Sequence, residues 1–156
     1  MIVVSDTSCI SNLLTIGHEH LLSELFGEVI IPPAVENELR RFHSVVPDFL
    51  KQVSPTSAAM LSRLRHELDA GEAEAICVAC ELQADRLLID EKLGRAVALR
   101  EGLAIIGVVG VLVAAKQKGL LPDIGTLLVR LEKEAGFHLS EMVKTAALQA
   151  MGEAKG

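Results

Sequence analysis

Four acidic residues from four separate segments have the types and places that a metal-dependent hydrolase would use: Asp6, Glu38, Glu72 and Asp90. Carboxylates that are brought together repel one another, so one of them takes up a proton unless a cation lies between them. Oxygen ligands alone favour a hard ion, Mg²⁺ or Mn²⁺, over zinc. Such an ion activates water and neutralises charge on a phosphate, which suits hydrolysis of a phosphodiester.

Asp6 and Asp90 follow short apolar runs that have the length of buried strands. Asp6 comes after residues 2–5, and Asp90 comes after residues 86–89. In an open parallel sheet, ligands bind beyond the carboxyl ends of the strands, so both acids would lie at the edge where sites are built. Each acid also has a plain structural role, because Asp often caps the helix that follows it. The sequence alone does not choose between the two roles.

Glu38 lies on the flank of a buried helical stripe that includes Val35 and Leu39. From that flank its side chain could lean over the edge of the sheet. The alternative is an ion pair with Arg40 or Arg41 on a solvated face of the helix.

Glu72 stands in the first turn of a helix at residues 72–82 that is apolar almost all round. A carboxylate in the first turn of a buried helix needs a partner, and a metal ion would be one. Asp69-x-x-Glu72 also has the pattern of a capping box, which is the structural alternative. Glu74 points about 160° away around the helix and is the weaker candidate.

Short apolar strands alternate with helices along the chain, which predicts a parallel sheet covered by helices on both faces. Strands are expected at residues 2–5, 28–31, 86–89 and 104–106, with an extended piece within 47–55. Helices are expected at residues 8–26 (with a break near 16–17), 33–42, 57–68, 72–82, 91–100, 109–118, 123–134 and 140–151. The predicted fold is a helix-rich three-layer α/β/α sandwich with a short parallel sheet, in one domain at 1–156 that ends in a helical hairpin from about residue 120.

Composition sets the class of protein. The chain has 156 residues, half of them hydrophobic, and a net charge of −6, so no general attraction to nucleic acid is expected. Neither a signal peptide nor an apolar run long enough to span a bilayer is present, which predicts a cytoplasmic protein with no membrane contact. Cys77-x-x-Cys80 lies inside an apolar helix, so core packing is favoured over redox or zinc chemistry.

Four stretches together resemble the PIN-domain ribonucleases, a family of metal-dependent nucleases that includes the VapC toxins of VapBC toxin–antitoxin pairs. "VVSDTS" resembles the opening strand and first acid, and "VIIPPAVENEL" the segment of the second acid. "LDAGEAEAICVACELQADRLLIDE" resembles the stretch that holds the third and fourth acids. "GLAIIGVVGVLVAAKQKGLL" is typical of a prokaryotic PIN-like subfamily of unknown function.

The resemblance implies an Mg²⁺- or Mn²⁺-dependent endoribonuclease with RNA as substrate, a homodimer, and, for a toxin, an antitoxin protein as partner. Asp6, Glu38, Glu72 and Asp90 would be both the catalytic residues and the metal ligands. The register also allows Glu74 in the third place and Glu91 as a further ligand. Thr7 and Ser8 would orient the ligands or hold water.

Arg95 is a further candidate, because it lies on the helix that begins near Asp90 and could hold RNA phosphates. Ordinary surface charge is an equal alternative. Two other functions compete with the nuclease. One is a PIN-like domain with weak or no catalysis that acts through protein partners. The other is a phosphatase or phosphotransferase with Asp6 as nucleophile, which is disfavoured because Ser8 stands where that class usually has a second Asp.

Overall fold

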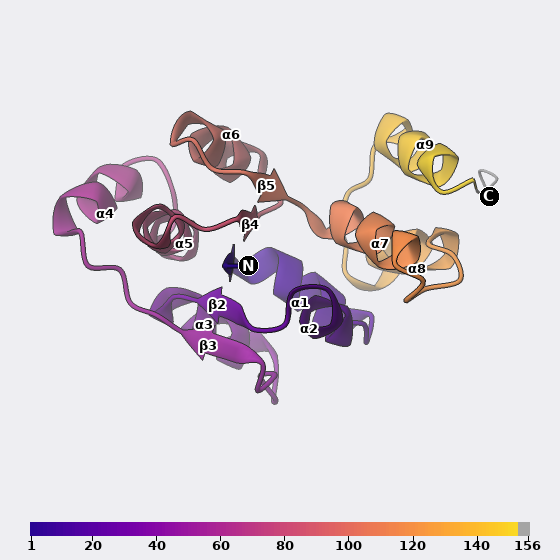
Figure 1. The fold of residues 1–156 in the computed structure, drawn as a ribbon, viewed down its shortest axis with the longest axis horizontal. Coiled ribbons are helices and arrows are strands. Elements are labelled where there is room, and N and C mark those ends of the chain that lie inside the picture. Colours follow the sequence, from indigo (N-terminus) through magenta and orange to yellow (C-terminus); the bar gives the residue numbers. More distant parts are fainter. Residues whose placement is uncertain (153–156) are drawn as a thin grey trace.

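The computed structural model describes residues 1–152, and a parallel sheet lies at its centre (Figure 1). The strand order is β3-β2-β1-β4-β5, and every pairing is parallel. The strands are short: β1 (Val3–Ser5), β2 (Val29–Ile31), β3 (Leu50–Gln52), β4 (Arg86–Leu88) and β5 (Ile105–Ile106).

Helices connect the strands and make up most of the chain: α1 (Thr7–Thr15), α2 (His20–Phe26), α3 (Pro33–Phe42), α4 (Ala58–Arg65), α5 (Ala70–Leu82), α6 (Lys92–Arg100), α7 (Val108–Gln117), α8 (Gly125–Glu134) and α9 (Glu141–Ala150). The expected break at Ile16-Gly17 separates α1 from α2. Gly17 takes a left-handed φ of 71°, which favours glycine. The extended piece expected within residues 47–55 is β3.

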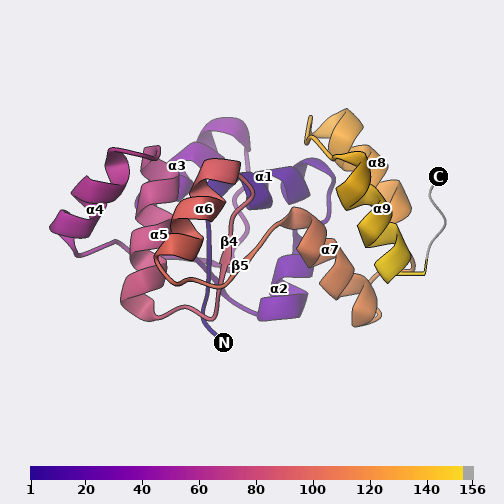
Figure 2. The same cartoon turned by 90° about the horizontal axis from the view of Figure 1, so that it is seen from above.

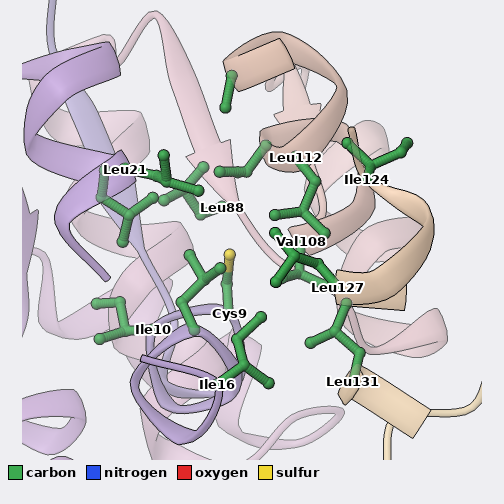
Figure 3. Close-up of a cluster of buried hydrophobic side chains, with 14 of the residues drawn as sticks. Cys9, Ile10, Ile16, Leu21, Leu88, Val108, Leu112, Ile124, Leu127 and Leu131 are labelled. Carbon is green, nitrogen blue, oxygen red and sulfur yellow. The ribbon is translucent and has the colours of Figure 1, made fainter. Parts of the chain in front are cut away.

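Alternate strand residues point to opposite faces of the sheet, as the pleat requires. Val3 and Leu88 face the layer of α1, α2 and α7, whereas Val4 and Leu87 face α4, α5 and α6. In Figure 3, side chains of α1, α2, α7 and α8 meet around Leu88. The three-layer α/β/α arrangement predicted from the alternating elements is therefore confirmed.

The C-terminal helices α8 and α9 lie side by side next to α7, at the far end of the molecule from α4 (Figure 2). Leu127, Leu131 and Leu148 are buried and join the same apolar cluster as α7. The pair therefore extends one of the two cores. Residues 153–156 of the expected hairpin lie outside the described part. Within residues 1–152, no helix is long and apolar enough to cross a membrane.

Candidate active site

The carboxyl ends of β1 and β4 meet at the centre of the sheet. From β1 the chain first moves outward to β2 and later returns to β4 on the other side. Such a reversal of strand order opens a crevice between the two strand ends. Asp6 follows β1, and its backbone N–H donates to the carbonyl of Leu88 at 3.0 Å. Asp90 follows β4 two residues later, so the two acids predicted from strand ends do lie at this edge.

A pocket of about 260 Å³ lies at this edge. Three of the four predicted acids line it, Asp6, Glu38 and Glu72, and so do Asp69 and Glu91. The rest of its lining is mostly hydroxyl and amide groups, with one aromatic ring: Thr7, Ser8, Ser11, Asn12 and Phe42. No Lys or Arg side chain of residues 1–152 lines this pocket, which we call the acid pocket. It is therefore suited to a cation.

Asp6 both caps a helix and faces the acid pocket. Its carboxylate accepts a hydrogen bond from the backbone N–H of Cys9 at 3.4 Å, and this bond caps α1. The same carboxylate also accepts from the hydroxyl of Ser8 at 3.2 Å. Only 2% of the residue is exposed. Burial, and then the nearby charge of Asp90, raise the pKa of Asp6 to about 8. The two roles weighed from the sequence are thus not exclusive.

Glu38 reaches the acid pocket from α3. The hydroxyl of Thr7 donates to Glu38 Oε2 at 2.8 Å and so links the first turn of α1 to α3. The alternative ion pair with Arg40 is not formed, because Arg40 pairs with Glu36 at 3.5 Å. A Cβ atom at Gly71 would lie 2.7 Å from Glu38 Oε1, so the absence of a side chain at Gly71 makes room for this carboxylate.

Glu72 reaches the acid pocket from the first turn of α5. The Asp69 carboxylate caps α5 by accepting from the backbone N–H of Glu72 at 2.9 Å. Glu72 Oε2 is buried and has no hydrogen-bond partner within residues 1–152. Burial, followed by the charges of Asp69 and Glu91, raises the pKa of Glu72 to about 7. Gly94 gives this oxygen its room, because a Cβ atom there would overlap it.

Glu74 lies away from the acid pocket, as the helical geometry predicts. Its buried carboxylate accepts from the backbone N–H of Ala34 at 3.1 Å and pairs with Arg65 at 3.3 Å. It therefore ties α5 to the start of α3, and Glu72 is the acid of this helix that faces the pocket.

Asp90 has a different structural role from the one considered in the sequence. Both of its oxygens accept from the backbone N–H of Val108, at 3.0 and 3.2 Å, so it caps α7 rather than the helix that follows it. Burial raises the pKa of Asp90 to about 6, although the Val108 N–H and the charge of Arg95 act in the opposite direction.

Glu91 supplies the carboxylate that follows β4 in the acid pocket. It occupies the N-cap position of α6 without a side-chain capping bond. Asp90 instead lines two neighbouring cavities. The sequence pattern predicts Asp69 only as a helix cap and does not predict Ser11 or Asn12 as pocket residues. Asp69 carried a visible signal, a carboxylate beside Glu72, whereas Ser11 and Asn12 carried none.

The family follows from a comparison with known proteins. A family model described as a PIN domain (DUF3368) matches residues 2–153. The chain belongs to the PIN-domain family. The PilT N-terminus domain protein SSO1118 from the hyperthermophilic archaeon Sulfolobus solfataricus P2 has a similar fold. The two structures match with a TM-score of 0.53, and their sequences are 20% identical. The match covers 74% of this chain and 93% of the archaeal chain. No protein with a curated function matches.

PIN domains are in general nucleases and typically use divalent metal ions, so the acid pocket can be tested for its fit to such an ion. The donors fit in kind, because the carboxylates, hydroxyls and amide supply hard oxygen ligands. The partnerless Glu72 Oε2 is an atom that a cation would satisfy. Within residues 1–152, however, no three such acids stand close enough together to hold an ion as placed.

Proposed function

We propose that this PIN-domain protein is an endoribonuclease that hydrolyses RNA phosphodiester bonds with Mg²⁺ or Mn²⁺. The carboxylates that would hold the ion are those at the strand edge: Asp6, Glu38, Glu72, Asp90 and Glu91. One observation carries the proposal. Five carboxylates of the described residues line the acid pocket, and no Lys or Arg of these residues does: Asp6, Glu38, Asp69, Glu72 and Glu91. One of their oxygens, Glu72 Oε2, is buried without a partner in the described residues.

The side chains around the acid pocket have distinct roles in the proposed reaction. When bound, the ion would supply an activated water molecule and neutralise charge on the phosphate. Ser8 and the Cys9 N–H orient Asp6, and Thr7 holds Glu38 toward the same space. Asp90, which is fixed by Val108, places a second negative charge beside Asp6. These bonds set the carboxylates in position before an ion arrives.

The experiment that tests the proposal compares purified wild type, Asp6→Asn and Asp48→Asn on mixed single-stranded RNA with Mg²⁺ or Mn²⁺. Asp6→Asn keeps the shape of the side chain but removes the charge that would hold the cation. Its cleavage should fall by orders of magnitude, and EDTA should abolish cleavage by the wild type. Asp48 is exposed and outside the acid pocket, so Asp48→Asn should cleave normally. Equal cleavage by all three proteins would show that the activity comes from elsewhere.

The proposal extends to a cytoplasmic toxin of a toxin–antitoxin pair that works as a homodimer and is held inactive by an antitoxin protein. Its support is the resemblance of the sequence segments to VapC toxins. If a neighbouring gene encodes a small DNA-binding protein, co-purification of that protein with this chain should suppress RNA cleavage. A partner that binds but leaves cleavage unchanged would contradict the toxin role.

The second candidate function is a PIN-like domain with weak or no catalysis that acts through protein partners. One observation favours it, since no three acids of residues 1–152 stand close enough to hold an ion as placed. Calorimetric titration with Mn²⁺ separates the two functions. Binding that is lost in Asp6→Asn supports the nuclease, whereas no binding to the wild type supports the partner-binding domain.

A further inference from the structure

A second cavity, of about 540 Å³, opens beside the acid pocket. A third cavity, of about 490 Å³, joins the two. It shares Ser8, Asn12 and Glu91 with the acid pocket, and Asp90, Lys92 and Phe137 with the second cavity. Shared walls of this kind make one continuous groove that leads from the acids toward the C-terminal helices.

The second cavity has the opposite charge from the acid pocket. Lys92 and Arg95 line it against a single carboxylate, that of Asp90. Arg95 Nη1 makes one long hydrogen bond, 3.4 Å, to the carbonyl of Ile89. Within residues 1–152, neither Lys92 nor Arg95 forms an ion pair with a carboxylate. Both cations therefore have donors left for an anion.

The remaining walls of the second cavity are apolar. Ile105, Ile106 and Val109 come from β5 and α7, while Phe137 and Val143 come from the C-terminal part of the chain. Phe137 is one of only four aromatic residues in the protein, and its ring is only partly buried. An aromatic ring among aliphatic side chains offers the flat apolar contact on which a nucleic-acid base stacks.

We propose that this second cavity, the nucleotide pocket, binds the phosphate and base of an RNA nucleotide that neighbours the bond to be cut. The proposal rests on the proposed nuclease function and names a subsite for its substrate. A nucleotide has an anionic and a flat apolar part, and the pocket has two cations beside an apolar wall. Because the groove is continuous, a strand that is held here passes the acid pocket. Arg95 holds the phosphate, and Phe137 contacts the base.

The test is a titration with 5′-AMP in EDTA, followed by methyl NMR of the whole chain. In EDTA no cleavage occurs, so binding is measured apart from activity. The methyl signals of Ile105, Ile106 and Val109 should shift saturably with 5′-AMP and much less with adenosine. Arg95→Gln should weaken binding about tenfold or more, since it removes a charged hydrogen-bond donor. Phe137→Leu should weaken it about as much, because a stacking contact is lost.

The matched control is Arg86→Gln, which removes an exposed arginine at the start of β4, at the opposite edge of the sheet. It should bind 5′-AMP like the wild type. Equal affinities of Arg95→Gln and Arg86→Gln for 5′-AMP would overturn the proposal, and so would wild-type methyl signals that do not shift. A protein segment would then be the better candidate to occupy the cavity.

Failure of the nuclease function would look different from failure of the nucleotide pocket. A chain that binds 5′-AMP as described but cleaves no RNA would support the nucleotide pocket and contradict the nuclease function. In an active enzyme, Arg95→Gln should mainly raise KM for RNA, whereas Asp6→Asn should lower kcat. An Arg95→Gln enzyme with unchanged KM would contradict the pocket and leave the nuclease in place.

Discussion

Two glutamates on α5 stand two residues apart and have opposite surroundings. Glu72 faces the acid pocket, where one of its oxygens is buried without a partner in the described residues and burial raises its pKa to about 7. Glu74, on the other side of the helix, is bound by the Ala34 N–H and by Arg65. One oxygen of Glu72 thus has no partner in the described residues, whereas each oxygen of Glu74 has one.

This difference separates a chemical role from a structural one. Helix α3 begins at Pro33 without a side-chain cap, and Glu74 supplies the missing acceptor from across the helix interface. Since α3 carries Glu38, Glu74 helps to place one wall of the acid pocket without entering it. A carboxylate that the fold leaves unpaired at a cavity is the better candidate for binding a cation.

The largest expected effect is on RNA cleavage. Glu72→Gln keeps the size of the side chain but removes a charge from the acid pocket, so the cleavage rate in Mg²⁺ should fall by orders of magnitude. Glu74→Gln should do much less, because the amide oxygen of the new side chain can still accept from the Ala34 N–H. The measurement is single-turnover cleavage of the same RNA by both variants. A larger loss in Glu74→Gln would reverse the roles assigned to the two faces of α5.

The next effect is on stability. Glu74→Ala leaves the Ala34 N–H without its acceptor and Arg65 without its partner. The free energy of unfolding should therefore fall by about 1–3 kcal/mol. Glu72→Ala removes a carboxylate with one buried oxygen that has no partner in the described residues, so it should cost less. Urea unfolding in EDTA measures both, and equal losses would show that Glu72 has a stabilising contact in solution.

Much of this contrast could be predicted from the sequence. Apolar runs that end in acids located the carboxyl edge of β1 and β4, because strands of a parallel sheet end on the same side. Helical geometry alone separates Glu72 from Glu74. Both predictions depend on periodicity within one segment, which a sequence shows directly. The parallel sheet and its covering helices could be predicted from the same kind of local periodicity, and the structure confirms them.

Other features depend on contacts between distant segments. Asp90 caps α7 through Val108, 18 residues away, because β5 lies beside β4 and delivers the start of α7 to the same edge. The sequence could only suggest a cap for the next helix. The strand β3 has the polar sequence LKQ and lies at the edge of the sheet, so no apolar run marks it. Such pairings follow from the order of strands, which local patterns do not determine.

The third effect is a pH dependence of stability. The pKa of Asp6 rises from 3.8 to about 8 on folding, so the metal-free folded protein keeps a proton that the unfolded chain loses. Its stability should therefore fall as pH rises from about 4 to about 8, by about 1.4 kcal/mol per pH unit for this proton. Glu72 acts with the same sign but is less buried than Asp6, so its contribution is smaller.

Urea unfolding in EDTA across this range of pH checks the prediction on the wild type and on Asp6→Asn. The variant cannot ionise at this position, so its stability should vary less with pH. Added Mg²⁺ should restore more stability at the alkaline end, because the ion replaces the lost proton. A variant with the same pH profile as the wild type would show that Asp6 is already ionised in the metal-free protein.

The smallest expected effect concerns the two cysteines that lie further along α5. Both are free thiols; Cys77 is buried as expected, but Cys80 is only partly buried, which the apolar pattern did not predict. Burial, and then the neighbouring Glu81 carboxylate, raise the pKa of Cys77 to about 12. Burial also raises the pKa of Cys80.

Since the thiolate is the reactive form, both cysteines should react slowly with a thiol reagent in the folded protein, and Cys80 should be the faster of the two. Mass spectrometry of Cys77→Ala and Cys80→Ala after brief labelling measures each site, and rapid labelling of Cys77 would contradict its place in the core.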